Sequence, residues 1–325
     1  MTHRSRQLAF LIAVLPIALC SFGLKAETVP VYSDRLIMPV AEDDIRHASS
    51  VTADPHTGEV FVTDTEGQRI LIFDSAGLFR YQISGGGLFQ APQDVAIDPE
   101  GLILVLAYGG TPGSLFELDF DGLFLREITI SNLPEGLRTP AIASMALAAN
   151  GEDLLVLDGA NSMLLFLSRE GIFKHSVDLK EKLSERESRD LMLGTVKVYG
   201  DTVLVSMASL GQVWCFDLDG ERCGAFGLKG TSPCKLGFPT AAALTADGKL
   251  IVVDQQRMII QLWSVRENRC LGDYYGIGTA PGFFYFPFDL ALDSKGRLYV
   301  AQGFEGRVQV YEGLAPAAGT ELDPE

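Results

Sequence analysis

Apolar positions along the chain come in short runs that alternate with polar positions and end at turn residues. The clearest copy is the stretch 286–311, in which three apolar runs are separated by Gly-containing turns at residues 293–296 and 303–306. Short alternating runs between such turns are typical of strands in an antiparallel meander. The pattern therefore predicts an all-β chain. One meander cannot bury both of its faces, so copies must pack on one another.

The meander recurs along most of the chain. Its second run is the best marker of register. It occurs six times at intervals of 43 to 51 residues, and the copies end at Asp64, Ala107, Asp158, Met207, Asp254 and Gln302. A third run follows each copy, and several copies add a Gly turn and a fourth run. Four strands in about 40–50 residues is the period of a propeller blade. The sequence predicts a six-bladed β-propeller of four-stranded antiparallel blades.

The two ends of the repeat predict how the ring closes. The sixth copy stops after its third strand, near Glu312, and the apolar segment 36–40 has no blade of its own. We expect residues 33–40 to pair with residues 307–312, because this removes two open sheet edges. The charged segment 180–191 departs from the strand pattern, and its composition predicts a short exposed helix between blades 3 and 4.

Three stretches carry a family resemblance. They are FQAPQDVAIDPEG (89–101), GFPTAAALTADGKLIVVD (237–254) and FPFDLALDSKGRLYVAQGFEGRVQVY (286–311), and they resemble NHL repeats. The resemblance spans residues 45–312 and is weakest in blade 4. It implies a six-bladed propeller. It does not imply one activity, because NHL-like propellers serve as binding scaffolds and their relatives include lyases and lactonases.

The chain ends differ in composition from the repeat. Residues 1–26 resemble a secretory signal peptide, with Arg4 and Arg6 before an apolar run over residues 8–19 and Ala26 at the expected cleavage point. A retained membrane anchor is the alternative, although the run is shorter than the ~20 residues that span a bilayer. We expect a propeller over residues 27–313, a disordered acidic tail over 314–325, and a periplasmic or extracellular location without a membrane span after cleavage.

Charge limits the partners. The formal net charge is −16, and cleavage would remove Arg4, Arg6 and Lys25, leaving 23 basic and 42 acidic residues and a net charge of −19. An acidic surface disfavours nucleic acid and anionic membranes, since both carry phosphate. It permits a basic partner or a bound cation, or it serves only to keep the protein soluble.

Aligning the innermost strands predicts a polar ring at one mouth of the central channel. The aligned residues are Ser50, Asp94, Ser144, Thr195, Ala241 and Asp289. Asp94 and Asp289 belong to blades 2 and 6, on either side of Ser50, so their carboxylates would repel unless a cation or basic group lay between them. Ca²⁺ is the cation that such oxygen ligands suit, and no other cofactor is indicated. The alternative is that both acids hold inter-blade loops through backbone hydrogen bonds, the role that we expect for Asp64, Asp158 and Asp254.

Other candidate binding residues lie near this mouth. His47 is the one histidine of the mature chain placed there, and the chain has no HExxH, GxSxG or CxxC motif. The segment 273–288 is rich in aromatic residues. Tyr274, Tyr275 and Phe284 are candidate anchors for a protein or glycan partner, and the alternative is that they wedge between blades 5 and 6. Phe286 aligns with Phe89 and Phe238 and is expected in the core.

Four cysteines follow the leader. Cys215 and Cys223 flank the turn at Asp219 symmetrically, which favours the pairs Cys215–Cys223 and Cys234–Cys270 in an exported protein. Four free, buried thiols are the alternative.

These features favour a non-catalytic binding or scaffold module for a protein, glycan or small ligand. The binding face would be the one that carries the inter-blade loops, and the protein would be a monomer or a subunit of an envelope complex. The alternative is a Ca²⁺-dependent hydrolase or lyase with its site at the channel mouth. Tightly bound metal in the purified protein would favour the enzyme.

Overall fold

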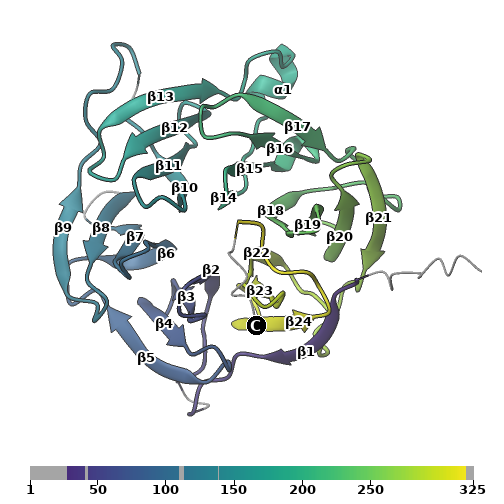
Figure 1. Cartoon of the computed structure of the whole chain (residues 1–325), viewed down its shortest axis with the longest axis horizontal. Coiled ribbons are helices and arrows are strands. Elements are labelled where there is room, and N and C mark those ends of the chain that lie inside the picture. Colours follow the sequence, from purple (N-terminus) through teal and green to yellow (C-terminus); the bar gives the residue numbers. More distant parts are fainter. Residues whose placement is uncertain (1–27, 41–42, 110–112, 138, 320–325) are drawn as a thin grey trace, which may run out of the picture.

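The computed structural model describes residues 28–40, 43–109, 113–137 and 139–319. Six four-stranded antiparallel sheets stand around a central channel as blades (Figure 1). The predicted six-bladed β-propeller is therefore confirmed. The expected signal peptide, residues 1–26, lies outside the described residues. Within the described ranges, no helix is long and apolar enough to cross a membrane.

Each blade contributes four strands from the channel outward. Blade 1 contains β2 (Ala48–Ala53), β3 (Val60–Asp64), β4 (Arg69–Phe73) and β5 (Phe79–Ser84). Blade 2 contains β6 (Gln90–Ile97), β7 (Ile103–Tyr108), β8 (Ser114–Leu118) and β9 (Phe124–Ile128). Blade 3 contains β10 (Ile142–Leu147), β11 (Asp153–Asp158), β12 (Met163–Ser168) and β13 (Phe173–Asp178).

Blade 4 contains β14 (Val196–Tyr199), β15 (Thr202–Met207), β16 (Gln212–Phe216) and β17 (Arg222–Phe226). Blade 5 contains β18 (Pro239–Leu244), β19 (Lys249–Asp254), β20 (Ile259–Ser264) and β21 (Arg269–Tyr274). Blade 6 contains β22 (Pro287–Leu292), β23 (Leu298–Gln302), β24 (Arg307–Glu312) and, at its outer edge, β1 (Val31–Arg35).

The second strand of each blade is apolar on both faces because both faces are covered. In β11, Leu155 and Leu157 pack into the core between blades 3 and 4, whereas Leu154 and Val156 pack into the core between blades 2 and 3. Successive side chains of a strand point to opposite faces of its blade. Because a neighbouring blade packs on each face, the second strand needs an unbroken apolar run. Burying each such side chain contributes about 2 kcal/mol. This requirement explains the apolar second run that marks each copy of the repeat.

The N-terminal strand β1 pairs with β24, the last strand of the repeat. The pairing is antiparallel, with Val31 opposite Glu312 and Arg35 opposite Gln309. The paired residues lie earlier in the chain than the expected 33–40. The apolar residues Leu36 and Met38 instead fill the core between blades 6 and 1, where they are buried. The Leu36 amide still donates to the Val308 carbonyl at 3.0 Å, so the backbone stays bonded to β24 one residue past the end of β1.

The charged segment between blades 3 and 4 contains the helix α1 (Glu185–Arg189). Ser184 caps its first turn and forms a reciprocal capping box with Glu187. None of its residues is buried. The predicted exposed helix is confirmed, but it is shorter than the charged segment. A single 3₁₀ turn, η2 (Ala208–Leu210), follows β15.

The segment after β24 contradicts part of the expected disordered tail. Leu314 and Ala317 are buried, and the Ala318 amide donates to the Leu244 carbonyl at 2.8 Å. The segment runs back to the channel beside β18 (Figure 1). Innermost strands leave one backbone edge without a sheet neighbour, and small residues can approach that edge closely. Residues 314–319 are therefore part of the propeller, and residues 320–325 lie outside the described residues.

Both predicted disulfides are present. Cys215–Cys223 joins β16 to β17 with Cα atoms 5.3 Å apart, and Cys234–Cys270 joins the loop before β18 to β21 with Cα atoms 5.6 Å apart. Cys215 lies opposite Gly224 rather than Cys223, because β17 carries a bulge there. Disulfides of this kind are compatible with a periplasmic or extracellular location.

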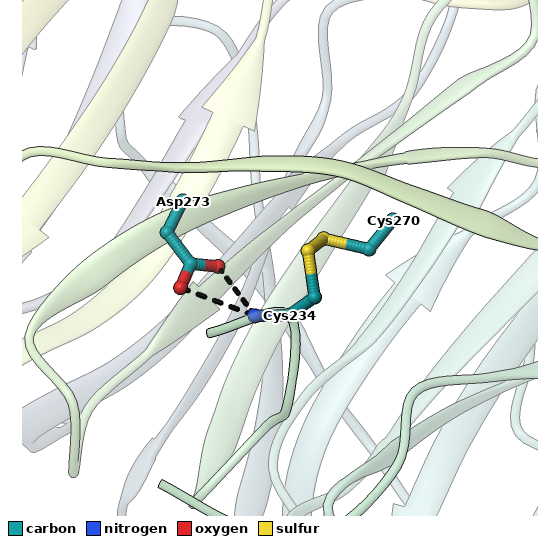
Figure 2. A group of neighbouring side chains, drawn as sticks. All are labelled: Cys234, Cys270 and Asp273. Carbon is teal, nitrogen blue, oxygen red and sulfur yellow. Dashed lines mark hydrogen bonds between the residues drawn. A yellow bond between two sulfur atoms is a disulfide. The ribbon is translucent and has the colours of Figure 1, made fainter. Parts of the chain in front are cut away.

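Asp273 lies next to the second disulfide (Figure 2). Its carboxylate accepts hydrogen bonds from the Cys234 amide at 3.3 Å and from the side chains of Arg257 and Gln261 at 2.5 and 2.6 Å. The two sulfur atoms are bonded to each other, so they offer no thiolate to a metal. This cluster therefore ties the blade 5 loop to the outer strand.

Candidate ligand site in the central channel

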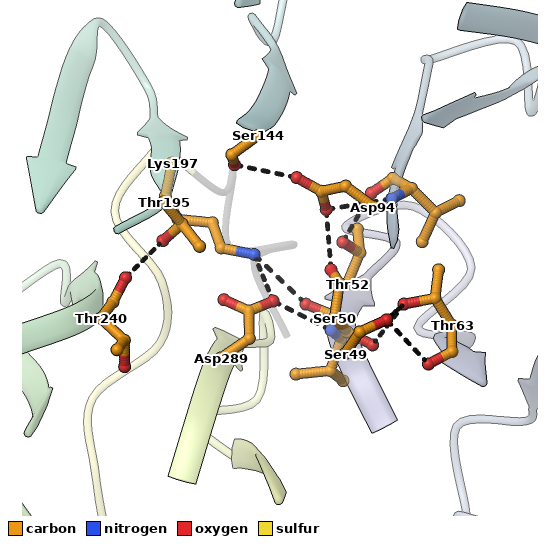
Figure 3. Close-up of polar contacts among 12 residues, drawn as sticks. Ser49, Ser50, Thr52, Thr63, Asp94, Ser144, Thr195, Lys197, Thr240 and Asp289 are labelled. Carbon is orange, nitrogen blue, oxygen red and sulfur yellow. Dashed lines mark hydrogen bonds and ion pairs between the residues drawn. The ribbon is translucent and has the colours of Figure 1, made fainter. Parts of the chain in front are cut away.

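Asp94 joins the innermost strands of three blades (Figure 3). Its Oδ1 accepts hydrogen bonds from the Ser50 hydroxyl at 2.7 Å and from the Val95 amide at 3.0 Å. Its Oδ2 accepts from the Ser144 hydroxyl at 2.9 Å and from the Met145 amide at 3.0 Å. Asp94 is only 4% exposed, and both serines are buried. Because all three residues are buried, they are not open to solvent at the channel mouth as expected. Their hydrogen bonds instead cross-link blades 1, 2 and 3.

Asp289 meets a cation supplied by the chain itself. Its Oδ2 accepts from the Lys197 ammonium at 2.8 Å and from the Val51 amide at 3.0 Å. Lys197 comes from β14 of blade 4, which lies opposite blade 1 in a ring of six. Its ammonium also lies 3.5 Å from the Val51 carbonyl, so its side chain crosses the channel (Figure 3).

Lys197 is not among the site residues predicted from the sequence. A signal was present, because Lys197 is the one basic residue in the six innermost strands of the described structure. A buried carboxylate requires a compensating charge or donors, so a lysine two residues past Thr195, the blade 4 residue aligned with Asp94 and Asp289, is a natural partner.

Burial and the neighbouring charges together shift the pKa values of Asp289 and Lys197. Burial raises the pKa of Asp289, Lys197 opposes the rise, and Asp94 adds to it. Burial alone would lower the pKa of Lys197, but the carboxylates of Asp289 and Asp94 outweigh burial and raise the pKa overall. The raised pKa favours the protonated form of Lys197, which has no lone pair for nucleophilic attack.

The two acids do not fit the Ca²⁺ site that we considered. Four donors already occupy the carboxylate oxygens of Asp94, and an ammonium lies against Asp289. Ca²⁺ takes six to eight oxygen ligands at ~2.3–2.6 Å, so it would have to displace these donors and the lysine. The structure favours the alternative, in which both acids hold innermost strands together through backbone and side-chain hydrogen bonds.

A cavity of about 410 Å³ occupies the channel on the other side of Lys197. It opens toward the turns that join the first and second strands, because Pro55, His56, Pro99 and Ala149 from those turns line it. Neither Asp94 nor Asp289 lines it. The cavity is therefore a blind funnel, and the Lys197 side chain lies at its closed end.

The wall of the cavity is mainly apolar side chain and backbone. Its lining includes Ala53, Ile97, Leu147 and Val198 from four innermost strands. Each innermost strand is bonded to a sheet neighbour on one edge only, so its other edge presents amide and carbonyl groups to the channel. In front of β18, residues 317–319 line the cavity instead of the strand. The site combines apolar area with a few fixed donors and acceptors, as small-molecule sites do.

The predicted aromatic anchors lie between blades rather than on the surface. Phe284 is fully buried, and Tyr274 and Tyr275 pack against the same core between blades 5 and 6. The Tyr275 hydroxyl accepts from the Tyr32 amide at 2.7 Å and donates to the Pro30 carbonyl at 2.9 Å. The alternative interpretation, a wedge between blades, is the one observed, and Tyr275 also holds the N-terminal strand.

The residue expected in the core, Phe286, is half-buried, and Phe284 takes that place. Phe284 and Phe89 both lie three residues before a proline, and both are buried. Counting from that proline, rather than matching the Phe-Pro pair, would have identified Phe284.

A different set of aromatic rings is exposed on the face that carries the inter-blade loops. We call this set the aromatic patch, and it consists of Phe283, Tyr285, Phe288 and Phe304. Phe304 is 70% exposed and lies 6.1 Å from His47, measured between ring centroids. His47 is therefore half-buried beside the patch, as a polar residue of the rim.

The acids that end the second strands have the expected structural role. Asp64 accepts from the His47 amide at 2.9 Å and from the Arg69 side chain at 3.1 Å. Asp158 and Asp254 accept in the same way from backbone amides of the loops that enter blades 3 and 5. These three acids fix the inter-blade loops.

Comparison with known proteins supports the fold alone. No protein-family model and no curated protein sequence matches this chain. A solved structure that does match is a structural genomics protein of unknown function from Bacteroides thetaiotaomicron, with a TM-score of 0.64 and 15% sequence identity. The match covers 86% of this chain and 72% of that chain. The protein is thus a six-bladed β-propeller, and the Lys197 side chain crosses its channel.

Proposed function

We propose that this protein is an exported, non-catalytic binding propeller of the NHL type that holds a small ligand in the channel cavity. The observation that carries the proposal is the funnel of about 410 Å³, open at the turn face and closed by Lys197. Export is supported by the signal-like leader and by the two disulfides. The cavity moves the proposed site to the face opposite the one expected from the sequence.

The residues around the cavity favour binding over catalysis. Lys197 is held protonated by Asp289, and the one histidine of the lining, His56, lies exposed in a turn at the rim. A nucleophile needs an adjacent base, and the described lining residues contain no such pair. The donors that face the cavity are fixed by the sheets, which suits recognition of a ligand.

A titration with prodan, a small neutral dye whose emission reports the polarity around it, tests this proposal. We expect one molecule of dye to bind each protein, with blue-shifted emission. The variant Ala149→Trp places an indole at the cavity rim and should weaken binding at least about tenfold. The matched control is Phe304→Ser, which removes the most exposed ring of the aromatic patch and should leave the affinity unchanged.

The two variants distinguish binding in the cavity from binding at the aromatic patch on the opposite face. Loss of dye binding in Phe304→Ser with full binding in Ala149→Trp would refute the cavity as the site. Failure of the wild-type protein to bind the dye or any other small apolar compound would refute the proposed function.

A second candidate role is docking of a protein or glycan at the aromatic patch. The exposed rings of Phe288 and Phe304 favour it, because aromatic anchors dominate many interfaces. Photo-crosslinking from position 304 in the exporting cell would test the role. A crosslinked product that disappears when Phe288 is changed to Ser would support docking, and the absence of any product would contradict it.

A further inference from the structure

We infer that the channel cavity selects a neutral, mainly apolar molecule that presents a carbonyl oxygen to the Lys197 ammonium. This inference rests on the proposed function and adds the chemical class of the ligand. It follows from the donor at the closed end of the cavity, the charges behind that donor and the composition of the wall.

The closed end supplies a hydrogen-bond donor. An ammonium has three N–H groups. Asp289 accepts one at 2.8 Å, and the contact with the Val51 carbonyl is long, at 3.5 Å. The Lys197 side chain remains 12% exposed and lines the cavity. A ligand oxygen that reaches the closed end can therefore accept from this ammonium.

The charges behind Lys197 disfavour an anionic ligand. Asp94 and Asp289 are two buried acidic groups that act on one ammonium, and only Asp289 contacts it. A ligand carboxylate would add a further charge in a buried place and would lose its hydration. The net charge of the chain, −16, also repels anions as they approach.

A cationic ligand meets the opposite difficulty. At the inner end of the cavity the charged group that it would meet is the Lys197 ammonium, because Asp289 is fully buried behind it. The other carboxylate of the lining, Asp293, is already bonded to Arg297 and Tyr299. Like charges in a poorly hydrated site repel strongly. The carboxylates are thus screened from a cation by the lysine that they hold in place.

The wall suits an apolar body with a neutral polar group. Ile97, Leu147 and Val198 offer apolar contact, and the strand edges offer backbone groups that hydrogen-bond to neutral oxygens. A ketone, ester, amide or quinone meets these requirements. The shared feature is an uncharged carbonyl at one end of a compact apolar frame.

A head-group series on one rigid frame tests the inference with the wild-type protein. Acetyladamantane, adamantane carboxylate and adamantylamine share the same cage and differ in one group that is neutral, anionic or cationic. We expect acetyladamantane to bind at least about tenfold more tightly than either charged compound in isothermal titration calorimetry. Ala149→Trp should abolish the binding of all three, and Phe304→Ser should abolish none.

The outcomes separate this inference from the proposed function. Equal affinity for the three compounds, or tightest binding of the carboxylate or the amine, overturns the inference while the cavity remains a binding site. Binding of none of the compounds overturns both. Since the ranking is measured on the wild-type protein, it does not depend on whether a Lys197 variant folds.

Discussion

The ammonium of Lys197 in blade 4 lies 2.8 Å from Oδ2 of Asp289 in blade 6, and the two residues are 92 positions apart in the chain. The Lys197 side chain lies between the buried acids Asp94 and Asp289 on one side and the cavity on the other. It also neutralises one of two carboxylates that would otherwise repel each other. One contact thus serves the stability of the ring and the shape of the site.

Replacing Lys197 by Met should destabilise the protein by about 3–5 kcal/mol, because it leaves the Asp289 carboxylate buried without its cation. Urea denaturation of the wild type and the variant measures this change. A loss below ~1 kcal/mol would show that the pair contributes little to the stability of the ring.

The double variant Lys197→Met with Asp289→Asn is the matched control. Asparagine can still accept from the Val51 amide but carries no charge. We therefore expect the double variant to be more stable than Lys197→Met alone, which is the non-additivity that a direct contact produces. Simple additivity of the two single changes would argue against the ion pair.

Tyr275 connects the N-terminal strand to blades 5 and 6, so its hydroxyl should matter for the whole ring. Tyr275→Phe loses the hydrogen bonds to Tyr32 and Pro30, and we expect a loss of about 2 kcal/mol in one cooperative transition. Tyr285→Phe, in the aromatic patch, should change stability by less than ~0.5 kcal/mol. A separate early transition in Tyr275→Phe would show that β1 frays independently.

The two disulfides should differ in their contributions because they close loops of different length. Their cysteines are 36 positions apart in Cys234–Cys270 and 8 apart in Cys215–Cys223. The chain-entropy relation gives about 4 kcal/mol for the longer loop and about 2.5 kcal/mol for the shorter one. Paired Cys→Ser variants, compared by denaturation under non-reducing conditions, test the order. A larger loss from the shorter loop would contradict it.

Glu117 predicts a pH dependence of stability. Burial alone would raise its pKa, but hydrogen bonds from Arg126 and Arg169 outweigh burial and hold the pKa below 4.5. A carboxyl group with a depressed native pKa stabilises the fold above its unfolded pKa, and this stabilisation disappears as the pH falls through the native pKa. The wild type should therefore exceed Glu117→Gln in stability near neutral pH, and the difference should shrink below about pH 4.5.

A neighbouring residue provides the control for this prediction. Glu127 lies on the same strand as Arg126 but is exposed, so Glu127→Gln should leave the free energy of unfolding close to that of the wild type. If the difference in free energy of unfolding between the wild type and Glu117→Gln stays constant from neutral to acidic pH, the stabilising role of the ionised Glu117 carboxylate is contradicted.

The sequence predicted the features that depend on local pattern. The six copies of the apolar run set the number of blades, and the symmetric positions of Cys215 and Cys223 around a turn indicated one disulfide. These signals are local because a strand and its hairpin partner lie close in the chain. The ring alignment also identified Asp94 and Asp289 as residues of one layer, although it placed them at the opening.

What the sequence did not predict depends on contacts across the ring. Lys197 meets Asp289 only because blades 4 and 6 face the same channel, and residues 317–319 enter the site only because the chain folds back over β18. The choice between Phe284 and Phe286 as the buried ring depended on the loop conformation before Pro287. Repeat alignment gives the level of a residue in a blade, but not which side chains cross the channel.

A crystal structure of the protein with acetyladamantane bound is the most direct test of the account. We predict that the cage lies in the channel cavity among Ile97, Leu147 and Val198, with its carbonyl oxygen within hydrogen-bond distance of the Lys197 Nζ. The Lys197–Asp289 pair should remain intact. A ligand bound at the aromatic patch around Phe304, with the cavity left unchanged, would contradict the assignment of the channel as the binding site.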